Sequence, residues 1–121
     1  MKKTFRSEAD VKTAVKECLK AMKAWYFMPS MNGFGRAGVP DIVGVLNGIP
    51  FAVETKFGHN KPTPAQKAEL LASYNAGTVS MIINETLLEV FVDVMSDIQL
   101  GLTPRARAMA ATTLKEYGVE V

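Results

Sequence analysis

The chain has almost none of the residues from which disulfide frameworks and soft-metal sites are built. Its 121 residues include one cysteine, Cys18, and one histidine, His59. A lone cysteine excludes an intrachain disulfide and a four-cysteine zinc site, and it indicates a reducing, intracellular setting. A lone histidine excludes a multi-histidine metal centre. Any bound metal would therefore rely on oxygen ligands, which suit Mg²⁺ or Mn²⁺.

Long apolar runs are also missing. No stretch approaches the roughly 18 consecutive apolar residues of a membrane-spanning helix. The basic residues 1–6 are not followed by the apolar core of a signal peptide. We therefore expect a soluble, cytoplasmic protein. With 48% hydrophobic residues and no internal repeat or linker, residues 1–121 are expected to form a single domain with its own core.

The charges that are present are unevenly distributed. Residues 1–67 contain 11 Lys and Arg against 5 Asp and Glu, a net of +6, whereas residues 68–121 contain 3 against 7, a net of −4. A basic half fits a partner that carries phosphates. A lysine stripe at helical spacing could contact DNA phosphates without reading sequence, but a solvated helix face looks the same and is the favoured interpretation. The stripe consists of Lys12, Lys16, Lys20 and Lys23.

Apolar periodicity and turn residues predict an α/β fold, a sandwich of helices around a mixed sheet. A pattern like a capping box, Ser7 to Asp10, opens the first helix, and Thr63 with Pro64 opens the second. The predicted helices cover about residues 7–24, 64–75, 85–99 and 104–117. The predicted strands cover residues 25–31, 41–46, 49–56 and 79–83, with a glycine-rich loop at 32–38.

The second and third predicted strands form a hairpin whose register can be derived. Asn47-Gly48 between two apolar runs is a strong signal for a two-residue turn. In such a hairpin, the numbers of two opposed residues sum to 95. Val45 then lies opposite Pro50 in a pair that makes no main-chain hydrogen bonds, so the missing N–H of Pro50 costs nothing. The same register places Asp41 opposite Glu54, and Lys56 projects from the same face of the strand as Glu54.

This trio has the composition of a metal-assisted hydrolytic site. Two opposed carboxylates destabilise a strand pair unless a divalent cation lies between them. Carboxylates supply the oxygen ligands that Mg²⁺ prefers, and Lys56 could hold or help to deprotonate an attacking water and offset charge on a phosphorane-like transition state. The alternative is an ion cluster at the exposed end of a strand; the register and the flanking residues favour the catalytic interpretation.

The same residues resemble a known nuclease signature. Pro40-Asp41, twelve intervening residues and Glu54-Thr55-Lys56 resemble the PD-(D/E)XK motif. The preceding Gly38-Val39, the hairpin, and the Lys-Pro-Thr-Pro-Ala-Gln run at 61–66 are similar to the VRR-NUC (virus-type replication-repair nuclease) branch of that superfamily. The resemblance covers about residues 7–84, and residues 85–121 add no motif that extends it.

The resemblance implies a restriction-endonuclease-like fold and an Mg²⁺- or Mn²⁺-dependent endodeoxyribonuclease. It implies that Asp41, Glu54 and the main-chain carbonyl of Thr55 bind the metal and that Lys56 acts on the water. Stand-alone members of the branch resemble Holliday-junction resolvases and tend to be homodimers. We therefore expect a homodimer that cuts branched DNA, as in DNA repair. The chain has no obvious sequence-reading module, which favours recognition of DNA structure.

Four further residues are candidates for the site. Glu8 heads the apolar stripe of the first helix and could complete the metal site, or it could be a first-turn carboxylate favoured by the helix dipole. Arg36, in the loop before the site, could grip a phosphate through its planar fork or be a solvated loop charge. Gln66 could orient the metal's water or touch phosphate, or it could face solvent. Lys61, in the matched run, is assigned to nucleic-acid binding.

Two alternatives to an enzyme are considered. A catalytically inactive nucleic-acid-binding module of the same fold would bind DNA without metal-dependent cleavage, and the intact Asp41, Glu54 and Lys56 set argues against it. An interaction domain with an acidic hairpin and no nucleic acid is disfavoured by the basic first half and by Arg36.

Overall fold

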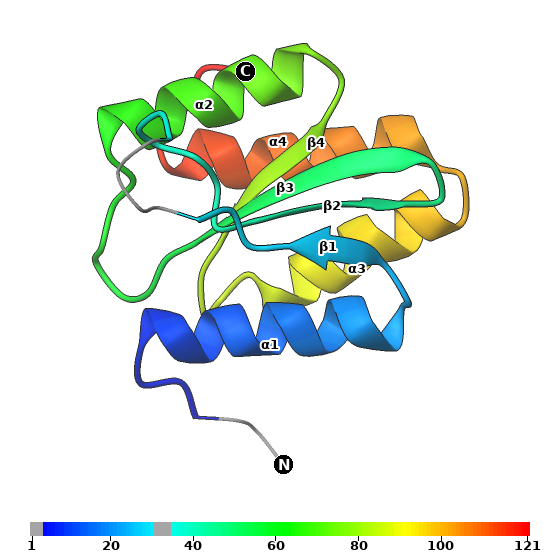
Figure 1. The fold of residues 1–121 in the computed structure, drawn as a ribbon, viewed down its shortest axis with the longest axis horizontal. Helices are drawn as coiled ribbons and strands as arrows, with labels where there is room; N and C mark the ends of the chain where they lie inside the picture. The colour runs from blue at the N-terminus through cyan, green and yellow to red at the C-terminus, as the bar shows by residue number, and fades with distance from the viewer. Residues whose placement is uncertain (1–3, 31–34) are drawn as a thin grey trace.

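A four-stranded sheet forms the centre of the molecule in the computed structural model, which describes residues 4–30 and 35–121 (Figure 1). The strands are β1 (Trp25–Phe27), β2 (Ile42–Leu46), β3 (Ile49–Thr55) and β4 (Val79–Ile83). They lie side by side in the order β1-β2-β3-β4. β2 runs antiparallel to both β1 and β3, and β4 runs parallel to β3 across a helical connection. The mixed sheet expected from the sequence is confirmed.

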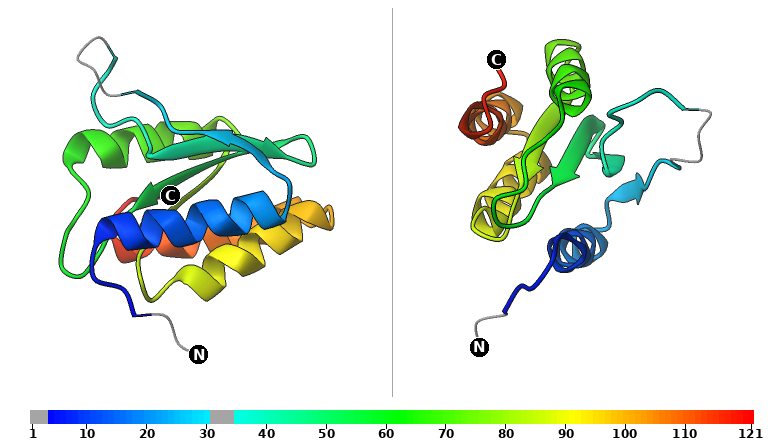
Figure 2. Two further views of the ribbon diagram at one scale, coloured as in Figure 1. Left: turned by 60° about the horizontal axis from the view of Figure 1, so that its bottom comes forward. Right: turned by 90° about the vertical axis from the view of Figure 1, so that its left-hand side faces the viewer.

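Helices cover both faces of this sheet. They are α1 (Glu8–Ala21), α2 (Pro64–Asn75), α3 (Leu88–Gln99) and α4 (Thr103–Glu116). In Figure 1, α1 and α3 lie below the strands, whereas α2 and α4 lie above them, and the turned views of Figure 2 show the same separation. No helix within the described ranges is both long and apolar enough to cross a membrane.

The two faces bury separate apolar clusters. The larger cluster joins the stripe of α1 to alternate residues of β3 and β4 and to α3, and its members include Val11, Val15, Leu19, Phe51, Val53, Met81, Phe91 and Met95. The smaller cluster lies on the other face of β4 and consists of Leu70, Ile82, Leu114 and Val119. Every residue of β4 is buried, as expected for a strand covered on both faces. These clusters fix α1 and α2 against the sheet.

The helix starts follow the predicted capping chemistry, with one difference. Thr63 and Gln66 form a complete capping box at the start of α2. At the start of α1, Ser7 Oγ accepts a hydrogen bond from the Asp10 amide at 3.2 Å, whereas the Asp10 carboxylate accepts from the Arg6 amide at 2.9 Å. The reciprocal bond of a regular capping box would come from Ser7. The Asp10 side chain, which is shorter than the usual Glu or Gln, therefore binds the amide of Arg6 in place of the amide of Ser7.

Three predicted boundaries are wrong, each for a local reason. The first helix ends at Ala21 and not near residue 24, because Lys23 adopts a left-handed φ of +58°. The first strand ends at Phe27, two residues before Pro29, which cannot donate to a strand ladder. Its predicted last residue, Met31, and loop residues 32–34 lie outside the described part of the chain. The third helix starts at Leu88, because Asn84 Oδ1 accepts the Thr86 amide in a turn.

Candidate active site

The candidate site is located where four elements meet at one end of the sheet. The N-terminus of α1, the beginning of β2, the end of β3 and the N-terminus of α2 all lie at the left-hand end of the molecule in Figure 1. Residues that are 46 positions apart, Glu8 and Glu54, thereby reach the same lysine. The topology of the fold, and not sequence proximity, assembles this site.

The predicted hairpin register is observed. The β2 and β3 pairs run from Leu46 with Ile49 to Ile42 with Val53, so opposed numbers sum to 95 throughout. Asp41 lies just before β2, and its main-chain amide donates a hydrogen bond to Glu54 Oε1 at 3.2 Å. The two acidic residues are therefore adjacent, and the bond that joins them comes from the main chain of Asp41.

The carboxylate of Asp41 is held by the end of β3. Its Oδ2 atom accepts hydrogen bonds from the amide of Thr55 at 3.0 Å and from the Thr55 hydroxyl at 2.7 Å. Its Oδ1 atom lies 3.9 Å from Lys12 Nζ. Sequence reasoning considered only the carbonyl of Thr55 and placed Lys12 on a solvated stripe. The spacing of Glu8 and Lys12, four residues apart on α1, was the signal that both could face one site.

Lys56 connects the acidic groups. Its Nζ atom lies 3.2 Å from Glu54 Oε2 and 3.9 Å from Glu8 Oε1. The lysine is only 8% exposed, and its amide extends the pairing of β3 by donating to the Ile83 carbonyl at 3.0 Å. This bond fixes the main chain of Lys56 where β3 ends. The ammonium is therefore held against Glu54 and is not a mobile surface charge.

Glu54 is in an environment that opposes its negative charge. The residue is 1% exposed, and this burial is the largest cause that raises the pKa of its carboxyl. The neighbouring charge of Asp41 also raises the pKa, whereas the charge and the hydrogen bond of Lys56 and the Asp41 amide lower it, and the balance of these effects is a pKa of about 7. A desolvated carboxylate beside a second carboxylate is a place where added positive charge stabilises the ionised form.

The donor groups fit a hard divalent cation. Asp41 and Glu54 offer carboxylate oxygens, and Thr55 between Glu54 and Lys56 offers a main-chain carbonyl. Across residues 4–30 and 35–121 there is no group of three His, Cys, Asp or Glu side chains arranged to hold a metal. Such a set of few protein oxygens is compatible with Mg²⁺, which retains several waters. Glu8 contacts Lys56, so its role as a metal ligand stays a prediction.

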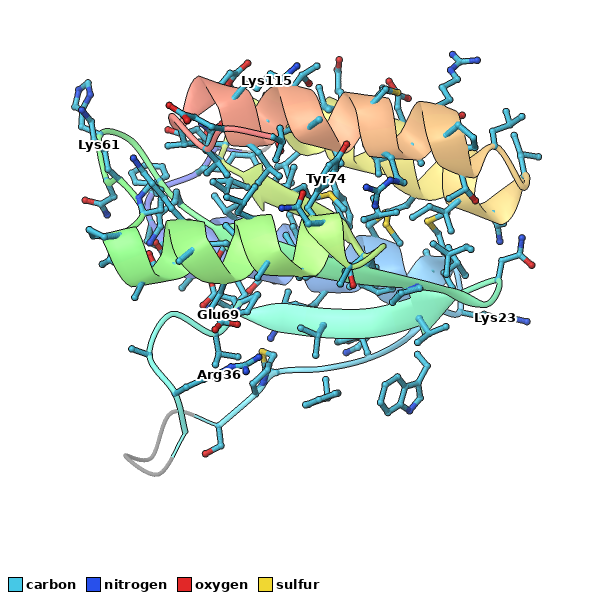
Figure 3. All side chains as sticks on the ribbon, turned by 90° about the horizontal axis from the view of Figure 1, so that it is seen from above. Lys23, Arg36, Lys61, Glu69, Tyr74 and Lys115 are labelled. Carbon is cyan, nitrogen blue, oxygen red and sulfur yellow. The ribbon has the colours of Figure 1, made fainter. Side chains whose placement is uncertain are left out.

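The three residues assigned to nucleic-acid contacts do not join this cluster. Arg36 Nε lies 3.1 Å from Glu69 Oε1 on α2, and Figure 3 shows the two side chains meeting between the loop and the helix. Gln66 uses its side-chain oxygen to accept the Thr63 amide at 2.9 Å. Lys61 is exposed and lies on a separate loop in Figure 3. Contacts of all three with nucleic acid stay predictions.

Gly38 has a structural role that sequence reasoning did not assign. It is buried and has a φ of +81°. A Cβ atom there would lie 2.4 Å from the carbonyl of Ala65 and 2.7 Å from the amide of Gln66. The loop before Asp41 therefore packs its main chain directly against the first turn of α2. This contact holds the loop that leads to Asp41 against α2.

Comparison with known proteins identifies a solved structure of similar fold. No family model matches the chain, and no curated protein matches it. A solved structure described as a VRR_NUC domain is similar, with a TM-score of 0.57 and 27% sequence identity. The match covers 68% of this chain and 94% of that chain. The resemblance first inferred from the motif is thus supported by the fold.

Proposed function

We propose that this chain, which has the fold of a VRR-NUC nuclease domain, hydrolyses DNA phosphodiester bonds with the help of Mg²⁺ or Mn²⁺. One observation supports the proposal above all others. Three groups of the PD-(D/E)XK-like motif converge at the end of the hairpin, with Asp41 N 3.2 Å from Glu54 Oε1 and Lys56 Nζ 3.2 Å from Glu54 Oε2. A buried acid of raised pKa in such a cluster is typical of a functional site.

Each residue has a distinct role in this proposal. Asp41, Glu54 and the Thr55 carbonyl would hold the cation, which would polarise a phosphate oxygen and acidify water when bound. The Thr55 amide and hydroxyl keep the Asp41 carboxylate in one orientation. Lys56 positions the attacking water and donates to phosphate oxygens as their negative charge grows. Water adds to phosphorus, the bond from phosphorus to the leaving sugar oxygen breaks, and that oxygen gains a proton.

The test is cleavage of a panel of linear, flap and four-way DNA substrates with and without Mg²⁺. Wild type should cut at least one substrate only when metal is present, and Glu54→Gln should lose the cutting because the amide is a poor cation ligand. Lys115→Gln is a suitable control, since Lys115 is an exposed lysine on α4. Cleavage that survives Glu54→Gln would contradict the assignment.

We extend the proposal to branched DNA and to a homodimer. Both extensions rest on the resemblance of the motif to stand-alone VRR-NUC domains, which resemble Holliday-junction resolvases. Two copies would present two active sites to two of the four strands of a four-way junction. Sedimentation should therefore give twice the mass of the chain, and four-way DNA should be cut faster than linear DNA. A monomer that cuts linear duplex equally well would contradict this part.

One observation favours the alternative of a catalytically inactive binding module. Lys12 and Lys56 already lie next to Asp41 and Glu54 and partly neutralise them without a metal. In that case the protein would bind DNA in a salt-sensitive way and cut none of the substrates, and Mg²⁺ would not change its stability. The two functions are separated by adding Mg²⁺ to the metal-free protein and measuring both unfolding and cleavage.

A further inference from the structure

Two aromatic side chains are exposed on the edge strand of the sheet. Trp25 is 63% exposed and Phe27 is 49% exposed, whereas Tyr26 between them packs against the larger core cluster. Residues at alternate positions of a strand share a face, so both exposed rings lie on one face of β1. Their centroids are 5.5 Å apart and their planes are tilted by 58°. The pair forms an open aromatic surface and not a packed core contact.

This surface is one wall of a groove that extends toward the loop before Asp41. The groove has a volume of about 470 Å³, and its lining runs from Trp25 and Phe27 across β2 to Val39 and Pro40. Pro40 immediately precedes Asp41 in the chain. The opposite wall is formed by α2, through Glu69 and Ser73. The groove therefore reaches the residue before Asp41, whereas Asp41, Glu54 and Lys56 themselves are not among its described lining residues.

The charges along the groove are few and paired. Among the described residues that line it, the charged side chains are those of Arg36 and Glu69, which form the 3.1 Å ion pair. The Arg36 side chain is nevertheless 78% exposed, and its ion pair engages Nε of a guanidinium that has five N–H donors. The groove thus combines flat apolar walls with an accessible cation at its rim. This combination suits a ligand with neutral planar rings and a negatively charged backbone.

We propose that this groove binds unpaired nucleobases of the DNA substrate, which stack on Trp25 and Phe27 while Arg36 contacts their phosphates. The inference rests on the proposed nuclease function and names the substrate feature that the site selects. Aromatic side chains provide stacking surfaces for bases of any identity, and arginine supplies backbone contacts. A duplex keeps its bases inside the stack and could not use such a surface. The groove therefore selects flaps, gaps or frayed junction arms.

The strand register places the stacked bases relative to the cut. Phe27 pairs with Val43 and Trp25 pairs with Val45, which are two and four residues from Asp41. At about 3.3 Å per strand residue, the two rings are displaced by roughly 7 and 13 Å from Asp41 along β2. Stacked nucleotides rise about 3.4 Å each. The bases on these rings are therefore expected two to four nucleotides from the cleaved bond.

A second copy of this chain is the other occupant that an apolar face could take. The nucleobase is favoured because the groove reaches Pro40, next to Asp41 in the chain, and has the exposed Arg36 guanidinium at its rim, which suits a ligand that carries phosphates. The two occupants differ in what they require of Trp25: stacking requires an aromatic ring, whereas a protein contact requires only apolar bulk.

The first experiment uses Trp25 as its own reporter, because it is the only tryptophan in the chain. Wild-type protein without metal is titrated with single-stranded oligothymidylate and, in parallel, with blunt duplex of equal length. We expect the single strand to quench the tryptophan emission to saturation and the duplex to quench it far less. Equal quenching by both, or no quenching by either, would overturn the proposal.

The second experiment compares variants on a flap substrate labelled for anisotropy. Trp25→Phe should bind close to wild type, whereas Trp25→Leu should bind about tenfold more weakly. Leu100→Ala is the control, since Leu100 is 73% exposed at the end of α3 and does not line the groove. Wild-type binding by Trp25→Leu would overturn the proposal. So would a fall in the sedimenting mass of Trp25→Ala, which removes the apolar bulk as well and would identify the groove as a contact between copies.

Cleavage separates failure of this inference from failure of the proposed function. If Glu54→Gln stops cutting but Trp25→Leu binds and cuts flap DNA like wild type, the nuclease stands and the base-stacking groove is wrong. If wild type never cuts but single strands quench the tryptophan, the base-stacking proposal stands for a protein that binds DNA without cutting it. Arg36→Gln should weaken flap binding and reduce its salt dependence, and an unchanged salt dependence would contradict the phosphate contact.

Discussion

Lys56 Nζ and Glu54 Oε2 form an ion pair at 3.2 Å in which neither residue is more than a tenth exposed. Burying two charges costs desolvation energy that their mutual attraction does not reliably offset. Such a pair is therefore weak evidence of a stabilising feature and better evidence of a functional one. Because the Lys56 amide is fixed to Ile83 and Glu54 accepts the Asp41 amide, the pair joins β2, β3 and β4 at one point.

Removal of Lys56 is predicted to separate catalysis from binding. Lys56→Ala should abolish turnover, because Lys56 is the cation that pairs with Glu54 at 3.2 Å, and it should leave DNA affinity within about threefold. It should also cost up to about 3 kcal/mol of unfolding free energy at pH 8, since Glu54 is left charged without a partner. The cost should be smaller at pH 5, where Glu54 takes up a proton. Cleavage assays and urea unfolding at both pH values measure these effects.

Lys20→Ala is the matched control for that change. Lys20 is an exposed lysine of the last turn of α1, so its removal subtracts the same charge away from the site. It should keep turnover and change stability by less than about 0.5 kcal/mol. Loss of folding in Lys56→Ala at both pH values would indicate that the lysine is structural.

The raised pKa of Glu54 predicts how metal-free protein responds to pH. The group titrates near 4.5 when unfolded and about 7 when folded, so between these values the folded state holds a proton that the unfolded state has lost. Stability is then greatest below pH 4.5 for this group and falls as pH rises toward 7, with a slope approaching about 1.4 kcal/mol per pH unit. Denaturant unfolding in EDTA between pH 5 and 8 measures the slope.

Glu54→Gln provides the comparison, because glutamine cannot titrate in this range. The slope assigned to Glu54 should be absent from the variant, and excess Mg²⁺ should reduce it in wild type by favouring the ionised carboxylate. If the wild-type and variant stabilities follow the same pH curve, the environment assigned to Glu54 is wrong.

The hairpin could be predicted from the sequence because its information is local. Asn47-Gly48 selects the turn, and Asn47 indeed has a positive φ of +52°. The turn then fixes every pair as far as Ile42 with Val53, and with them the neighbourhood of Asp41 and Glu54. Capping of α2 by Thr63 was equally local.

The contacts from α1 could not be predicted in the same way. The approach of Lys12 to Asp41 and of Glu8 to Lys56 depends on how the helix docks on the sheet, which is decided by core packing. The groove depends on α2 leaving the outer part of β1 and β2 uncovered, which no sequence pattern specified. Trp25 was visible in the sequence, but its exposure was not, because aromatic residues in a strand usually indicate core.

Thr55 is predicted to set the orientation of Asp41 through its hydroxyl. Thr55→Val keeps the shape and the main-chain amide bond but removes the 2.7 Å hydrogen bond to Asp41 Oδ2. We expect a loss of about 1–2 kcal/mol in stability and a several-fold rise in the Mg²⁺ concentration that half-saturates cleavage. Thr55→Ser retains the hydroxyl and should resemble wild type in its metal requirement. A metal requirement unchanged in Thr55→Val would show that the main-chain bond alone suffices.

Gly38 is predicted to be among the least replaceable residues of the loop before the site. Gly38→Ala would place an L side chain at a φ of +81°. It would also place a Cβ atom 2.4 Å from the Ala65 carbonyl, a main-chain group that cannot move without shifting α2. We expect a loss of at least about 2 kcal/mol in unfolding free energy, together with reduced cleavage because Asp41 follows three residues later. Gly58→Ala is the matched control: its φ of +60° carries the same left-handed strain, but nothing lies within 4 Å of the added Cβ. It should cost only about 1 kcal/mol. Equal losses in the two variants would mean that strain in φ alone, and not the contact with α2, makes glycine necessary at Gly38.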